Sequence, residues 1–152
     1  MSFAEMPEVL RRVVNRSPFF RRLKMALLEA RDGSARIGLE VRPFHLNTQG
    51  IVHGGVLCTL VDVASAVAVG STLDLHERPR TLAMEMRYLT PGPPQGSLEA
   101  MGTIIKRIGH RVTAAASVRD DQGRILCEGS CKFAIVKATR MEGRAPRGEK
   151  MG

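Results

Sequence analysis

The stretch from residue 54 to residue 73 is the feature that most constrains the fold of this chain. It is apolar on almost every side of a helix, and it carries one acidic residue, Asp62, in its third turn. A helix that is apolar all round belongs in a protein core, and a carboxylate there is costly unless it is paired or takes part in chemistry. The fold must therefore cover this helix, and Asp62 is the first candidate for a functional residue.

Alternating apolar residues and turn signals predict the strands that would cover the helix. They run over residues 34–41, 81–89, 97–108, 111–119 and 124–136, and the last four are expected to form an antiparallel meander. Residues 120–123, Asp-Asp-Gln-Gly, read as a hairpin turn. The apolar face of such a sheet must be covered, and the central helix is the segment apolar enough to cover it. The prediction is an α+β fold in which a five-stranded antiparallel sheet wraps around a long helix.

The ends of the chain differ from this central domain. Residues 1–33 are expected to form a helical lead-in, with a short helix over 7–15 and a second helix that starts at Ser17-Pro18 and stops at Asp32-Gly33. Residues 137–152 are rich in glycine, proline and charge and are expected to be disordered. The chain thus divides into a lead-in (1–33), one globular domain (34–136) and a basic tail (137–152).

Composition narrows the cellular setting. The first residues lack the apolar core of a signal peptide, and no stretch is long and apolar enough to cross a bilayer, so no membrane partner is expected. The three cysteines, Cys58, Cys127 and Cys131, are an odd number without metal-ligand spacing. Reduced thiols of this kind predict a cytoplasmic protein.

The net charge of +8 points to an anionic partner. Basic residues gather between residues 11 and 24 and around a turn at Gly109, where Lys106, Arg107 and Arg111 stand close together. Nucleic acid is one partner for such a chain, but no helix-turn-helix cue, zinc-finger spacing or aromatic stacking platform accompanies the charge. A phosphorylated small molecule fits the charge equally well, and solubility alone is the third explanation.

The run Asn47-x-x-Gly50-x-x-His53-Gly54-Gly55, followed by Leu-Val-Asp62, resembles hotdog-fold thioesterases of the phenylacetate-pathway type. That group includes thioesterase superfamily member 2. The later segment 81–91, with Tyr88 and Pro91 near its end, resembles the second strand of the same family. The resemblance covers roughly residues 34 to 136 and does not include the tail.

The resemblance implies an acyl-CoA thioesterase that releases a free acid and CoA. It implies no metal and no cofactor other than the coenzyme A of the substrate, and a homodimer that is usually part of a dimer of dimers. Each active site in the family takes its carboxylate from the helix of one subunit and its carbonyl-polarising groups from the loop of the other. Matched residue by residue, the site is Asp62 as catalytic carboxylate, Gly54 as backbone N–H donor, His53 and Asn47 as orienting groups, Thr81 as the hydroxyl that holds water or the carboxylate, and Gly55 as a further substrate contact.

The chemistry explains why these residue types suit thioester hydrolysis. Negative charge develops on the carbonyl oxygen, and a helix N-terminus offers free backbone N–H groups and the positive end of the helix dipole. Asp62 either attacks the thioester carbon or removes a proton from water, and the sequence leaves both roles open. Each residue also has a structural explanation: Asp62 could pair with an arginine, His53 and Asn47 could shape the loop, and Thr81 could simply open a strand.

Lys106, Arg107 and Arg111 are the candidates for binding the phosphates of CoA, since guanidinium groups bind phosphate in a bidentate manner. Exposed hairpin arginines are common without any ligand, which is the alternative. The main competing function is a non-catalytic acyl-CoA-binding or sensor module on the same fold. A dehydratase acting on acyl thioesters and a nucleic-acid-binding protein rank below it.

Overall fold

The central helix α3 (Gly54–Gly70) is the core of the computed structural model, which describes residue 10, residue 14 and residues 16–138. Its fully buried residues include Leu60, Val61 and Ala64. The helix ends three residues earlier than expected. The hydroxyls of Ser71 and Thr72 donate to the carbonyls of Ala68 and Val69, so side chains satisfy the last turn and the chain leaves the helix.

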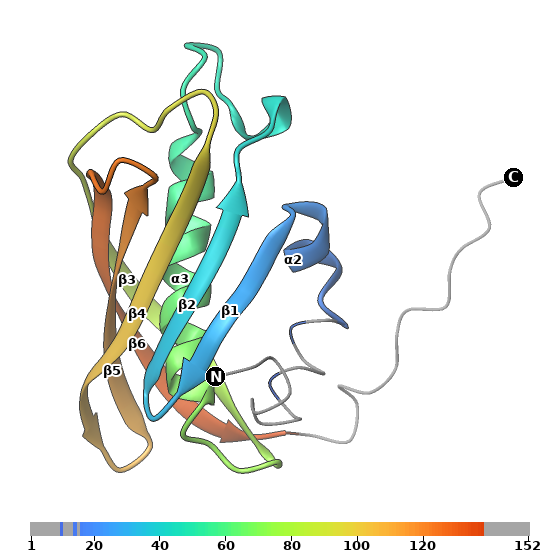
Figure 1. Cartoon of the computed structure of the whole chain (residues 1–152). Coiled ribbons are helices and arrows are strands. Elements are labelled where there is room, and N and C mark those ends of the chain that lie inside the picture. Colours follow the sequence, from blue (N-terminus) through green and yellow to red (C-terminus); the bar gives the residue numbers. More distant parts are fainter. Residues whose placement is uncertain (1–9, 11–13, 15, 139–152) are drawn as a thin grey trace, which may run out of the picture.

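An antiparallel sheet curves around α3, as Figure 1 shows. Within the described residues it has six strands, in the spatial order β1-β2-β4-β5-β6-β3. Their bounds are β1 (Met25–Arg31), β2 (Ser34–Glu40), β3 (Glu77–Tyr88), β4 (Ser97–Ile108), β5 (Arg111–Asp120) and β6 (Ile125–Lys137). A short helix, α2 (Pro18–Arg22), precedes the sheet, and a 3-10 turn, η2 (Pro43–His45), lies between β2 and α3. The predicted α+β architecture, a sheet wrapped around one long helix, is confirmed.

The sixth strand, β1, corrects the expected helical lead-in. The helix that starts at Ser17 ends at Arg22, because Lys24 adopts a left-handed conformation with φ of 57° that stops it. Met25 and Leu27 then alternate with exposed residues and pack on the core. Asp32 and Gly33 both have positive φ and form the two-residue turn of a β1–β2 hairpin, not the end of a helix.

The expected meander of four strands holds only for β4, β5 and β6. Strand β3 pairs with β6 at the edge of the sheet and does not pair with β4. The segment after β3 contains Pro-Gly-Pro-Pro, which cannot form a tight hairpin. It crosses the end of the sheet instead, where the N–H of Val52 donates to Gly92 O and the N–H of Val41 donates to Gly96 O.

Other local predictions agree with the structure. Strands β2, β4, β5 and β6 begin and end within one or two residues of the expected positions. In the 120–123 turn, Asp120 Oδ1 accepts hydrogen bonds from the N–H groups of Gln122 and Arg124. Apart from Leu10 and Val14, which are both buried, the expected first helix (7–15) lies outside the described residues, as does the tail beyond residue 138. No helix in the described part of the chain is long and apolar enough to cross a membrane.

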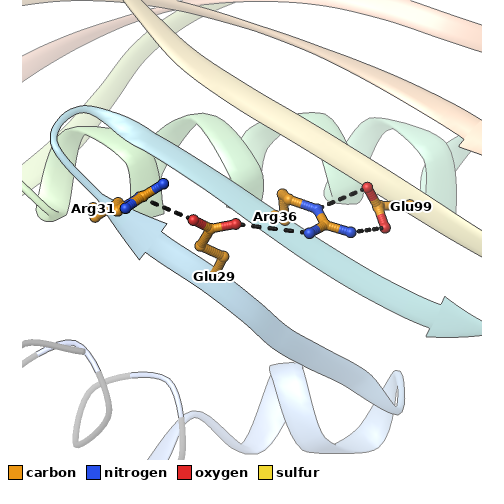
Figure 2. A network of polar contacts seen from close by, with 4 residues as sticks. All are labelled: Glu29, Arg31, Arg36 and Glu99. Atoms are coloured by element: carbon orange, nitrogen blue, oxygen red, sulfur yellow. Dashed lines mark hydrogen bonds and ion pairs between the residues drawn. The ribbon is translucent and has the colours of Figure 1, made fainter. Parts of the chain in front are cut away.

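A chain of ionic contacts ties the edge strand β1 to β2 and β4 on the face away from α3 (Figure 2). Arg36 donates to both carboxylate oxygens of Glu99, at 2.9 and 2.8 Å, and lies 3.7 Å from Glu29, which in turn contacts Arg31. The hydrogen bonds with Arg36 lower the pKa of Glu99, and the same contact raises the pKa of Arg36. Such exposed pairs contribute only about 0–1 kcal/mol each, so they align the strands more than they stabilise the fold.

Candidate active site

The loop before α3 is shaped by Asn47. Its backbone N–H donates to Ile51 O at 2.8 Å, and its side-chain Oδ1 accepts from the N–H groups of Gln49 and Ile51 at 2.9 and 3.3 Å. Gly50, with φ of 75°, completes the turn in a conformation that favours glycine. Asn47 therefore holds the loop through its oxygen, while its amide nitrogen can still reach a ligand in the pocket that it lines.

His53 caps the N-terminus of α3. Its Nδ1 accepts a hydrogen bond from Gly55 N at 2.8 Å. Because Nδ1 is an acceptor, the proton of the neutral ring resides on Nε2, which is a donor on an exposed side chain. The same bond occupies the N–H of Gly55, so that glycine has no free amide for substrate. A Cβ at Gly55 would lie 3.0 Å from the histidine ring, so a larger residue there would require the ring to shift.

Gly54 is the first residue of α3, and its N–H has no acceptor among the residues that the structure describes. It borders a pocket of about 310 Å³ that also includes Asn47, Leu57 and Tyr88. The Tyr88 hydroxyl donates to Gly54 O at 3.2 Å, and a Cβ at Gly54 would stand 3.4 Å from the ring. A free amide at the positive end of a helix, beside a pocket, is suited to polarise a carbonyl.

Sequence reasoning did not include Tyr88 among the site residues. The signal that could have identified Tyr88 is its position near the end of segment 81–91, which resembles the second strand of the family. Desolvation, followed by the neighbouring thiols of Cys58 and Cys127, raises the pKa of Tyr88. The hydroxyl therefore stays protonated at neutral pH and keeps its bond to the helix N-terminus.

Asp62 lies half-buried on the one side of α3 that the sheet does not cover completely. Thr81 Oγ1, on strand β3, donates a hydrogen bond to Asp62 Oδ1 at 3.0 Å. The structure thus brings together two predicted site residues that are far apart in sequence. The carboxylate keeps its second oxygen for other partners, as a nucleophile or general base would require.

Asp62 and Gly54 of one chain do not converge. They are eight residues apart on a single helix, which at about 1.5 Å per residue separates them by roughly 12 Å. A carboxylate and an oxyanion donor that act on one thioester must both lie about 3 Å from it. Within one chain, the candidate residues therefore form two separate groups, which we call the candidate half-sites: Asp62 with Thr81, and Gly54 with His53 and Asn47.

The basic hairpin between β4 and β5 lies at the opposite end of the sheet from the Asn47–Gly54 loop (Figure 1). Lys106, Arg107 and Arg111 are all exposed, and Arg107 Nε donates to Gly109 O at 3.3 Å. Through the strand register, Arg107 is in the same row as Thr81, three strands away, or roughly 14 Å. The three basic residues are grouped with one another but do not contact Asp62.

Comparison with known proteins identifies the family to which the chain belongs. A model of the thioesterase superfamily matches residues 49–127, which is more than half of the chain. The chain belongs to the thioesterase superfamily. A solved structure of another protein of the thioesterase superfamily is 33% identical, with a TM-score of 0.78, over 85% of this chain and 97% of the other. The fold is therefore the predicted hotdog fold.

Two further matches come from named bacteria. The medium/long-chain acyl-CoA thioesterase YigI of Escherichia coli (strain K12) is 32% identical over 113 residues, which cover 64% of this superfamily member and 72% of YigI. A hypothetical thioesterase of Streptococcus pneumoniae TIGR4, solved with coenzyme A, has a TM-score of 0.69 at 24% identity, over 75% of this chain and 90% of the other. At that identity the second match concerns the fold alone.

Proposed function

We propose that this thioesterase superfamily protein hydrolyses acyl-CoA thioesters to a free acid and CoA. The observation that carries the proposal is the Asp62–Thr81 pair, a half-buried carboxylate oriented by a hydroxyl on an otherwise apolar helix. The similarity to YigI supports acyl-CoA as the substrate class. A protein that only binds acyl-CoA has no need of a half-buried carboxylate on an otherwise apolar helix, where its desolvation is costly.

In the proposed reaction the thioester carbonyl oxygen accepts the Gly54 N–H, and the Nε2–H of His53 helps to orient the substrate. Asp62 then attacks the carbonyl carbon to form a mixed anhydride that water hydrolyses, or it takes a proton from the attacking water. In both routes the C–S bond breaks, CoA leaves as the thiol after protonation, and the acyl group leaves as the carboxylic acid. Thr81 keeps the carboxylate in the attacking orientation.

The proposed site needs two chains. Because Asp62 and Gly54 of one chain are roughly 12 Å apart along α3, one thioester cannot contact both. A second copy that places its Asn47–Gly54 loop against Asp62 would bring the two half-sites together. The proposal therefore includes a homodimer. A dimer of dimers and membership of the phenylacetate-pathway type remain predictions.

The test is the release of free CoA from a panel of acyl-CoAs, measured for the wild type and for Asp62→Asn. The variant is nearly isosteric and should lower kcat by at least about a hundredfold, the usual scale for the loss of a general base. Asp32→Asn is the matched control, since it removes an exposed carboxylate from the β1–β2 turn. If the wild type binds acyl-CoA but releases no CoA, the protein is the binding module. Near-wild-type turnover by folded Asp62→Asn would reject the mechanism.

A further inference from the structure

Helix α3 and the edge strand β3 contact each other and run in opposite directions. Tyr88, the last residue of β3, bonds to Gly54 at the start of α3, and Thr81 bonds to Asp62 further along the helix. Beyond this second bond, toward the end of α3, lies a separate pocket of about 240 Å³, which is lined mainly by apolar atoms.

This second pocket is lined by the end of α3, the start of β3 and two residues of the N-terminal segment. We call it the acyl pocket and define it by Leu10, Val14, Ala66, Gly70, Leu73 and Pro79. Ala66 is one helical turn beyond Asp62 and Gly70 is two turns beyond it, or about 6 and 12 Å along the helix. Pro79 is two residues before Thr81 on β3, so the nearest lining residues lie one helical turn and two strand residues from the Asp62–Thr81 pair.

Small residues on α3 make room in this pocket, and the N-terminal residues close it. A Cβ at Gly70 would lie 3.1 Å from a methyl group of Leu10, so this side chain meets the helix at the far end. Two of the charged side chains that line the pocket bond to nearby backbone groups. Arg78 Nη1 donates to the carbonyls of Leu75 and Glu77, and Glu77 Oε2 accepts from Asp74 N. The interior is left to apolar atoms.

We propose that the acyl pocket receives the tail of the acyl chain and that Leu10 and Val14 set the length that it accepts. This inference rests on the proposed function and names its substrate class, the straight, medium-chain acyl-CoAs. An acyl group whose carbonyl is at Asp62 would extend about 12 Å along α3 to reach Gly70 and its neighbour Leu10, which suits an extended medium-length chain. Polar acyl groups do not match the mainly apolar lining of this pocket.

The experiment compares kcat/KM for butyryl-, hexanoyl-, octanoyl-, decanoyl- and dodecanoyl-CoA. In the wild type, kcat/KM should rise by up to roughly fourfold for each methylene that the pocket buries, and should stop rising once the pocket is full. Ala66→Leu blocks the entrance and should reduce kcat/KM for octanoyl-CoA at least tenfold while it changes that for butyryl-CoA less than twofold. Leu10→Ala opens the far end and should move the preferred chain length upward.

Thr103→Leu is the matched control, because it adds the same side chain on an exposed position of β4, on the face away from α3. It should leave the chain-length profile unchanged. Parallel profiles for the wild type, Ala66→Leu and Leu10→Ala would overturn the inference, as would an equal loss on all substrates by a folded Ala66→Leu protein. If Ala66→Leu does not fold, Ala66→Val and Leu10→Ala carry the same test.

The inference can be separated from the proposed function by measuring binding without turnover. S-butyl-, S-octyl- and S-dodecyl-CoA are thioethers that cannot be hydrolysed, and calorimetry gives their dissociation constants. If the protein releases no CoA but Ala66→Leu selectively weakens binding of S-octyl-CoA, the pocket is correct and the hydrolase proposal fails. If CoA is released but Ala66→Leu does not alter chain-length selectivity, the hydrolase proposal stands and the acyl pocket is rejected.

Discussion

Asp62 depends on one side chain of another element for its orientation. Thr81 Oγ1, on strand β3, donates to Asp62 Oδ1, on helix α3, at 3.0 Å. Hydrogen bonds to charged groups contribute more than neutral ones, and here the bond also selects one rotamer of the carboxylate. At the scale of single residues, we therefore regard Thr81 as a positioning residue for the proposed reaction.

Thr81→Val should lower kcat by roughly tenfold to a hundredfold, the loss expected when a hydrogen bond of about 1.5–3 kcal/mol to a charged group no longer holds the carboxylate. KM should change much less, since the hydroxyl orients Asp62 and not the substrate. Steady-state kinetics with one acyl-CoA measures both constants. Thr81→Ser is the control, because it keeps the hydroxyl and should retain most of the activity. Equal kinetics for the valine and serine variants would mean that the bond has no role in turnover.

The carboxylate of Asp120 holds the turn between β5 and β6 through hydrogen bonds. Burial raises the pKa of Asp120, but the hydrogen bonds from the N–H and guanidinium groups of Arg124, together with that from Gln122 N, outweigh this and hold the pKa below its ordinary value. A carboxyl group whose pKa is lower in the folded state favours folding when it is ionised. The contribution is present above the unfolded-state pKa, about 3.9, and is lost as the pH falls through the folded-state value.

Asp120→Asn should therefore lower Tm at pH 6, and the difference from the wild type should shrink as the pH approaches 3. Thermal unfolding followed by circular dichroism at several pH values between 3 and 7 measures this. Asp121→Asn, the exposed neighbour in the same turn, is the matched control and should change Tm little at any pH. A Tm difference for Asp120→Asn that stays constant over the whole range would contradict the electrostatic explanation.

The hairpin between β4 and β5 carries the predicted CoA contacts. Replacing Arg107 and Arg111 with alanine should raise KM for acyl-CoA and leave kcat nearly unchanged, as the loss of uniform binding does. The effect should be smaller for an acyl-pantetheine, which lacks the nucleotide phosphates. A double change of Arg21 and Arg22 in α2 removes the same charge from elsewhere and should not raise KM. Equal losses with both substrates would show that the hairpin does not bind the phosphates.

In the whole molecule, the two half-sites and the open sheet edge both lead us to expect that two chains associate. Strand β3 is an edge strand with exposed apolar side chains, among them Leu82 and Tyr88. An unpaired edge of this kind tends to associate. Asp62 of one chain and Gly54 of a second chain could then act on one substrate, which a single chain does not allow.

Subunit complementation tests this arrangement. Asp62→Asn and Asn47→Ala should each be inactive alone, the second because the loop loses the oxygen that holds it. After co-refolding, a mixed dimer has one site with both changes and one site with neither, so mixed dimers should regain up to about half of the wild-type activity. The test is valid only if Asn47→Ala alone is first shown to have severely reduced activity. Mixed dimers that are present by mass spectrometry yet inactive would place each site within one chain.

Much of this protein could be predicted from local sequence. The apolar stretch and the glycines before it predict α3, and the turn at residues 120–123 predicts its hairpin, because these features depend on interactions between near neighbours in the chain. The same stretch identified Asp62 and Gly54 as candidates. The catalytic and binding roles of these residues, and those of His53, Asn47 and the basic hairpin, remain predictions.

The tertiary structure alone decided the rest. The start signal at Ser17-Pro18 predicted a helix up to Asp32-Gly33, but pairing with β2 and burial of Met25 and Leu27 favoured a strand. The position of β3 beside β6, the contact of Thr81 with Asp62 and the closure of a pocket by Leu10 likewise join residues that are distant in sequence. Local preferences differ by only about 1 kcal/mol per residue, so packing between distant segments decides among alternatives that the sequence leaves nearly equal in free energy.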